Sequence, residues 1–84
     1  MPVISRFYGI VIRMYFLQGE HNPPHIHAIY NDDVVAVDFI TGKVLEGFLP
    51  PGPMRMVQKW ILIHKDALHE MWKTQEFRKL PPLK

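Results

Sequence analysis

Three proline clusters constrain this chain of 84 residues most strongly, because they fix where its elements end. The clusters are Pro23-Pro24, Pro50-Pro51-Gly52-Pro53 and Pro81-Pro82. Proline can neither donate to a strand ladder nor continue a helix, so each cluster predicts an element boundary. A chain of this length forms a single domain. We therefore expect one domain over residues 1–84, with a sheet over about 3–49, a helix over about 53–74 and a tail over 77–84.

The part of the chain before the second cluster predicts four strands. The run from Arg6 to Leu17 is rich in β-branched and aromatic residues and predicts one strand, in which Gly9 marks a bulge or a close approach. The other strands are expected at His25–Tyr30, Val34–Ile40 and Val44–Leu49. Short turns join these three strands, so the pattern predicts an antiparallel four-stranded meander.

The first predicted strand is apolar on both faces. Its alternation places Tyr8, Ile10, Ile12, Met14 and Phe16 on one side and Phe7, Val11 and Tyr15 on the other. A strand of this kind lies in a two-sided core or is covered by another chain. We therefore expect a homodimer or a complex with another protein.

The segment after Pro53 predicts an amphipathic helix. Its apolar stripe has a period of 3.6 residues and consists of Val57, Trp60, Ile61, His64, Leu68, Met71 and Trp72. Charged residues such as Lys59, Asp66 and Glu70 lie opposite. The expected class is α+β, with one long helix on one face of the sheet and the other face left for solvent or a partner.

Composition limits the function classes. The chain has no cysteine, which excludes disulfide scaffolds, cysteine–zinc sites and thiol nucleophiles, and fits a reducing cytoplasm. No stretch is long enough for a membrane helix, so we expect a soluble cytoplasmic protein with no membrane partner. Residues 53–84 carry seven Lys or Arg against three acidic residues, a balance of +4. Such a balance suits RNA, DNA or an acidic protein, and equally a solvated helix face.

The most unusual segment is the block from His21 to Tyr30, HNPPHIHAIY. Because His25 and His27 are two residues apart on a predicted strand, they share one face, with Cα atoms about 6.6 Å apart. If Ile26 and Ala28 face the helix, the histidine pair faces outward. The proline pair stiffens the approach to this strand.

Three interpretations of the block stay open. In the first, His21, His25 and His27 bind a divalent metal such as zinc. In the second, His25 and His27 act as general acid and base on RNA, which would make the chain a ribonuclease-type enzyme. In the third, the histidines only brace the proline turn by hydrogen bonds and ring contacts. The sequence does not choose among these interpretations.

The acid–base interpretation implies supporting residues. His64 is then expected to orient the pair, although a histidine in an apolar stripe also fits the core. Arg6, Arg13 and Arg55 are candidates for binding the phosphate. Tyr30, at the end of the block, is a further candidate binding residue.

The whole chain resembles the small bacterial proteins grouped as domain of unknown function family 4160. The resemblance is carried by MPVISRFYGIVIRMYF, HNPPHIHAIY, GFLP, KWILIHKDALHEMW and LPPL, and Pro-Pro-His-x-His is its most specific piece. The chain departs from the family pattern at Met71-Trp72, where we expect Asn before the Trp. The resemblance implies a small bacterial protein encoded beside another small gene, a layout like that of toxin–antitoxin modules. Our leading hypothesis is a toxin-like component that binds a protein encoded nearby, with RNA as a second candidate partner, and the alternative is a metal-binding or structural interaction module. The resemblance implies no catalytic residue, since the family has no established activity.

Overall fold

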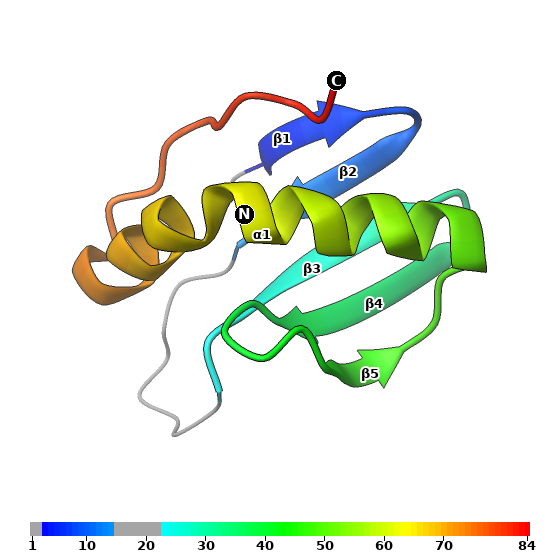
Figure 1. Cartoon of the computed structure of the whole chain (residues 1–84), viewed down its shortest axis with the longest axis horizontal. Coiled ribbons are helices and arrows are strands. Elements are labelled where there is room, and N and C mark those ends of the chain that lie inside the picture. Colours follow the sequence, from blue (N-terminus) through cyan, green and yellow to red (C-terminus); the bar gives the residue numbers. More distant parts are fainter. Residues whose placement is uncertain (1–2, 15–22) are drawn as a thin grey trace.

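The computed structural model describes residues 3–14 and 23–84 of the chain. It contains five strands and one helix, which are β1 (Val3–Phe7), β2 (Ile10–Arg13), β3 (His25–Tyr30), β4 (Asp33–Asp38), β5 (Val44–Gly47) and α1 (Pro51–Thr74). The strands form one antiparallel sheet in the order β1-β2-β3-β4-β5. Helix α1 crosses one face of this sheet (Figure 1). The predicted α+β class with a C-terminal helix is therefore confirmed.

The predicted number of four strands is wrong, because the first predicted strand is a hairpin. The chain turns at Tyr8 and Gly9, which have φ values of 49° and 80°. Two consecutive positive φ angles are typical of a two-residue type I′ turn, whose twist matches the flanking strands. Gly9 adopts such an angle at little cost, whereas Tyr8 rarely does, so the sequence signal for this turn is weak.

The hairpin also explains why the first run is apolar on both faces. Phe7 and Ile10 pair directly across β1 and β2, and both are buried. Tyr8 is 60% exposed, since it occupies the turn. The alternation of inward and outward side chains therefore starts again after the turn. The apolar residues before and after the turn face the same core, so this pattern does not require a second chain to cover it. Tyr15 and Phe16 lie outside the described residues.

The core lies between the sheet and α1. Alternate residues of β2, β3 and β4 bury side chains on the helix side, among them Ile12, Ile26 and Val37. The helix contributes Trp60, which is completely buried and stacks on Phe7 with ring centroids 5.9 Å apart. The predicted stripe is therefore the buried face of α1, with Val57, Ile61, Leu68 and Met71 also buried.

The C-terminal tail covers one edge of the sheet. The backbone N–H of Leu80 donates to the carbonyl of Ile4 in β1 at 2.7 Å, and Leu80 is buried. The indole Nε1 of Trp60 donates to the carbonyl of Pro81 at 2.9 Å. The tail thus runs beside β1, while β5 forms the opposite edge (Figure 1). Among the described residues, no helix is long and apolar enough to cross a membrane.

We call the sheet surface that faces away from α1 the outer face. Its side chains alternate with the buried ones and include Arg6, Val11, Arg13, His25, His27, Ile29, Val34, Ala36 and Glu46. Among the described residues, α1 lies over the opposite face and contacts this one through Trp72 at His25. The other polar side chains of the outer face are therefore the ones that a ligand can reach.

Candidate functional site

One cross-strand row on the outer face brings together the charged and titratable side chains. Arg13 pairs with His27 between β2 and β3, His27 pairs with Ala36 between β3 and β4, and Ala36 pairs with Glu46 between β4 and β5. Residues directly opposite one another in a sheet point to the same side. The row therefore runs from a cation through an imidazole and a small residue to a carboxylate.

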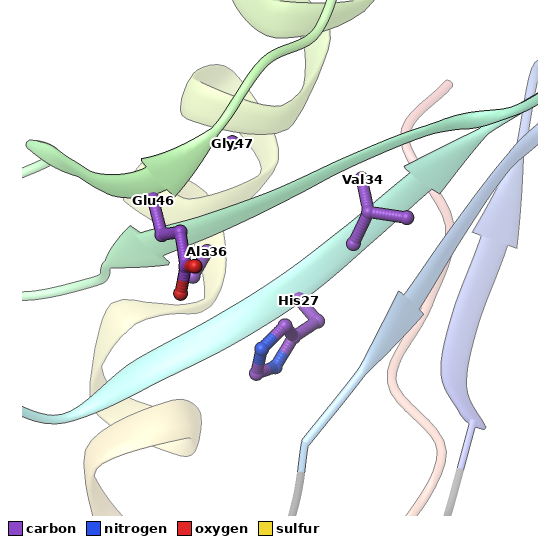
Figure 2. Close-up of a pocket in the computed structure, with 5 residues that line it drawn as sticks. All are labelled: His27, Val34, Ala36, Glu46 and Gly47. Carbon is purple, nitrogen blue, oxygen red and sulfur yellow. The ribbon is translucent and has the colours of Figure 1, made fainter.

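The row contains a hollow, because its third member is small. His27 and Glu46 stand on either side of Ala36, with Val34 on the same side of the sheet (Figure 2). These four residues and Gly47 line a space of about 260 Å³. A neighbouring space of about 210 Å³ shares His27, Ala36 and Glu46 and is also lined by Pro23, His25 and Leu45. Together they form one shallow hollow over β4, which we call the outer hollow.

The shape of β5 depends on Gly47. This residue has a φ of 86°, and a Cβ atom there would lie 2.1 Å from the carbonyl oxygen of Val34. The β4–β5 register also shifts between Ala36 and Val37, which is a bulge-type irregularity. Such irregularities bend a strand and re-aim its side chains. Only glycine therefore lets β5 approach β4 closely enough to place Glu46 opposite Ala36.

The two histidines of the block are neighbours on the outer face. Their ring centroids are 5.1 Å apart, and the rings meet edge to face at 72°. Ile26 between them is buried on the helix side, as the alternation predicts.

The ring of His25 is held on two further sides. Its Nδ1 forms a hydrogen bond of 2.8 Å with the carbonyl of Pro23, so Nδ1 carries the proton and donates. Trp72 of α1 packs against it with centroids 5.4 Å apart. In the neutral ring, this bond fixes the tautomer and leaves the lone pair on Nε2, as in many metal-binding and catalytic histidines.

The environment of His27 favours the neutral imidazole. Burial lowers the pKa of His27 below its ordinary value, and the charge of His25 lowers it further. The carboxylate of Glu46 acts in the opposite direction and raises this pKa. His27 is therefore poised as a proton acceptor at neutral pH.

Arg13 adds a cation beside His27. Its side chain is half-buried, and its Nε atom is buried without a hydrogen-bond partner among the residues that the structure describes. A buried guanidinium N–H without an acceptor lowers the stability of the fold, unless a ligand or a water molecule accepts its hydrogen bond. Among the predicted basic residues, Arg13 is thus the strongest candidate for binding an anion on this face.

The other predicted site residues lie apart from this row. Arg6 is exposed on the outer face of β1, opposite Val11 and one row away from Arg13. Tyr30 pairs with Ile10 on the helix side, and Arg55 is exposed in the first turns of α1. The structure therefore groups Arg13 with His27 and places Tyr30 and Arg55 elsewhere.

His64 contacts Trp60 rather than the histidine block. The two rings have centroids 4.9 Å apart, and His64 is half-buried in α1 at a kink with φ −107° and ψ 16°. The α1 side chain that contacts the histidine block is Trp72, which packs against His25, whereas the ring contact of His64 is with Trp60.

Of the two acidic residues opposite this row and the histidine block, Glu46 and Asp38, only Glu46 lines the outer hollow. Glu46 was not singled out from the sequence, although its position opposite Ala36 follows once Ala36 and Glu46 are placed in neighbouring strands. Asp38 pairs with His25 in the register, but its Oδ1 accepts the backbone N–H groups of Ile40 and Thr41 at 2.7 and 3.2 Å. That carboxylate therefore stabilises a turn.

The predicted metal ligand His21 lies outside the described residues. Within residues 3–14 and 23–84, no three His, Asp or Glu side chains lie close enough to hold one ion. A metal on His25 and His27 would therefore need a ligand from elsewhere.

Comparison with protein families finds a match over most of the chain. The model of the domain of unknown function DUF4160 matches residues 9–73. No curated protein and no solved structure matches the chain. The match covers most of the chain and includes β2 to β5 and nearly all of α1. The chain therefore belongs to the DUF4160 family, as the resemblance in its sequence predicts.

Proposed function

We propose that this chain is the toxin-like component of a bacterial two-gene module and that it cleaves RNA through His25 and His27. The observation that supports this proposal best is the pairing of two contacting imidazoles with the cation Arg13 on an uncovered sheet face. Acid–base cleavage of a phosphodiester needs a proton acceptor, a proton donor and a positive charge near the phosphate.

In this mechanism His27 is the general base. Its lowered pKa keeps the ring neutral at neutral pH, so it accepts the proton of the ribose 2′-hydroxyl. The 2′-oxygen attacks the phosphorus, and the bond from phosphorus to the 5′-oxygen breaks. Arg13 stabilises the negative charge on the phosphoryl oxygens. The products are a 2′,3′-cyclic phosphate and a free 5′-hydroxyl.

His25 is the general acid and gives a proton to the leaving 5′-oxygen. Its Nδ1 already donates to the carbonyl of Pro23, so the proton that it transfers is the one on Nε2. A charge on His25 disfavours a charge on His27. Two charged rings side by side are therefore disfavoured, and the mechanism uses the state in which only His25 carries the charge.

The proposed protein partner acts by covering the outer face. The neighbouring edge offers apolar side chains, since Val44, Leu45 and Phe48 are 49%, 43% and 61% exposed. An exposed edge strand can also pair with a strand of another protein. Binding there would close the outer hollow and inhibit the site.

Induced expression in a bacterial host tests the proposal. The original chain is expected to arrest growth, and His25→Ala and His27→Ala are expected to abolish the arrest. His69→Ala is the matched control, because His69 is exposed on α1 away from the site. Circular dichroism of the purified variants shows whether they are folded. Folded variants that still arrest growth, or a chain without any effect on growth, would overturn the proposal.

The second candidate function is metal binding by the same block. The bond from His25 Nδ1 to Pro23 supports it, because metal-binding histidines commonly donate their second ring nitrogen to a carbonyl. Metal analysis of untagged protein, with thermal melts in chelator, tests this candidate. About one equivalent of zinc and a melt that chelator lowers would favour it over metal-free acid–base chemistry.

A further inference from the structure

We propose that the part of the outer hollow between His27 and Glu46 is a guanine-binding subsite, so that the chain cleaves RNA after guanosine. This inference rests on the proposed function and names the substrate of the same site. It starts from the position of Glu46, a carboxylate at the far end of the row that carries Arg13 and His27.

The row separates His27 from Glu46 by a distance that suits one nucleoside. Neighbouring strands lie about 4.8 Å apart, so His27 and Glu46, two strands apart, are separated by roughly 10 Å. Arg13 lies on the other side of His27. A phosphate beside Arg13 therefore lies far from the carboxylate of Glu46. With the ribose at His27, the base of the same nucleotide extends over Ala36 toward Glu46.

The chemistry of a carboxylate selects among the four bases. An ionised carboxylate only accepts hydrogen bonds, through two oxygens side by side. Guanine alone presents two adjacent donors, N1–H and the N2 amino group, on its Watson–Crick edge. Adenine and cytosine place an acceptor beside their amino group, and uracil flanks its N3–H with two acceptors. Glu46 therefore matches guanine and repels an acceptor atom of each other base.

The walls of the hollow fit a planar ring. Ala36 provides a small floor, and Val34 provides an apolar wall that is 47% exposed. Gly47 adds no side chain, so the space over β4 stays open (Figure 2). Proteins commonly read single-stranded RNA by taking one unstacked base into such a site and bonding its Watson–Crick edge.

Cleavage of matched RNA strands tests the inference. Four single-stranded oligonucleotides differ only in one central base, and the positions of the 2′,3′-cyclic ends are mapped. We expect cleavage after guanosine to be at least about tenfold faster than after any other base. Glu46→Gln replaces one acceptor oxygen with a donor and is expected to remove this preference. Glu70→Gln, at an exposed carboxylate of α1, is expected to keep it.

Nucleotide binding separates this inference from the proposed function. Guanosine 3′-monophosphate is expected to shift the NMR signals of His27, Ala36 and Glu46 at lower concentration than adenosine 3′-monophosphate. Cleavage without base preference overturns the guanine subsite and leaves the proposed function standing. Selective guanosine monophosphate binding without cleavage of any RNA supports the subsite and overturns the nuclease mechanism. If the chain shows neither RNA cleavage nor selective binding of guanosine monophosphate, both the proposed function and the guanine subsite are overturned.

Discussion

His25 and His27 meet edge to face on the outer face, with ring centroids 5.1 Å apart, while Ile26 between them is buried in the core. The strand alternation puts both histidines on the same face, because every second side chain points to the same side. The same contact links the protonation of the two rings.

The pKa of His27 is expected to respond in opposite directions to its two charged neighbours. His25→Gln removes a charge that lowers this pKa, so the pKa should rise. Glu46→Gln removes a charge that raises it, so the pKa should fall. NMR titration of the imidazole signals measures both changes. An unchanged His27 pKa in both variants would show that the charges do not interact.

Stability is expected to fall as the pH falls below the ordinary histidine pKa of 6.5. Because the folded pKa of His27 is lower, the unfolded chain binds this proton more readily in that range. Above about pH 7.5, roughly one unit over 6.5, the ring is neutral in both states and contributes no pH dependence. His27→Gln should therefore lose part of the decrease in unfolding free energy between neutral and mildly acidic pH, and His69→Gln should keep it. Urea unfolding at several pH values gives the comparison, and equal slopes in all three proteins would contradict it.

Gly47→Ala is expected to destabilise the fold much more than Gly42→Ala. Both glycines have positive φ, 86° and 79°, so both variants carry a backbone cost of about 1–2 kcal/mol. Only at Gly47 does the new Cβ atom meet the Val34 carbonyl, while nothing lies within 4 Å of it at Gly42. We expect Gly47→Ala to cost about 2 kcal/mol more than Gly42→Ala in chemical unfolding. Equal losses would mean that β5 does not depend on this close approach.

Trp60→Phe is expected to loosen the C-terminal tail. The change removes the hydrogen bond from Nε1 to the Pro81 carbonyl and leaves a smaller ring in the core. We expect a loss of about 1–3 kcal/mol and faster removal of the last residues by carboxypeptidase. Leu62→Ala is the control, since Leu62 is 73% exposed and its truncation should change neither readout. If carboxypeptidase removes the tail no faster in Trp60→Phe than in the original chain, the hydrogen bond from Trp60 to Pro81 does not hold the tail in place.

The sequence predicts most of the fold because its signals are local and periodic. The prolines before α1 and the 3.6-residue stripe place the helix, which begins at Pro51 rather than at the expected Pro53. The alternation around Ile26 and Ala28 correctly predicts the outward direction of the histidines. The hairpin at Tyr8 and Gly9 is not predicted, because a tyrosine with positive φ has no distinctive sequence pattern. Missing this turn places Phe7 and Ile10 on opposite faces of one strand, whereas they pair on the same face.

The site was predictable only in part, because its members come from different strands. His25 and His27 are close in sequence, so their common face follows from alternation. The nearness of Arg13 and Glu46 depends on the register of three strand pairs, which the sequence does not specify on its own. For His64 the sequence supports both a core position in the stripe and an orienting role at the histidine pair, and in the structure its ring contacts Trp60.

The most direct test of the central claim is cleavage of a single-stranded RNA by the purified, untagged chain in the presence of a chelator. The acid–base account predicts products with 2′,3′-cyclic phosphate ends, lost in His25→Ala and His27→Ala and retained in His69→Ala. Intact RNA with the original chain, or equal cleavage by the folded histidine variants, would contradict the account.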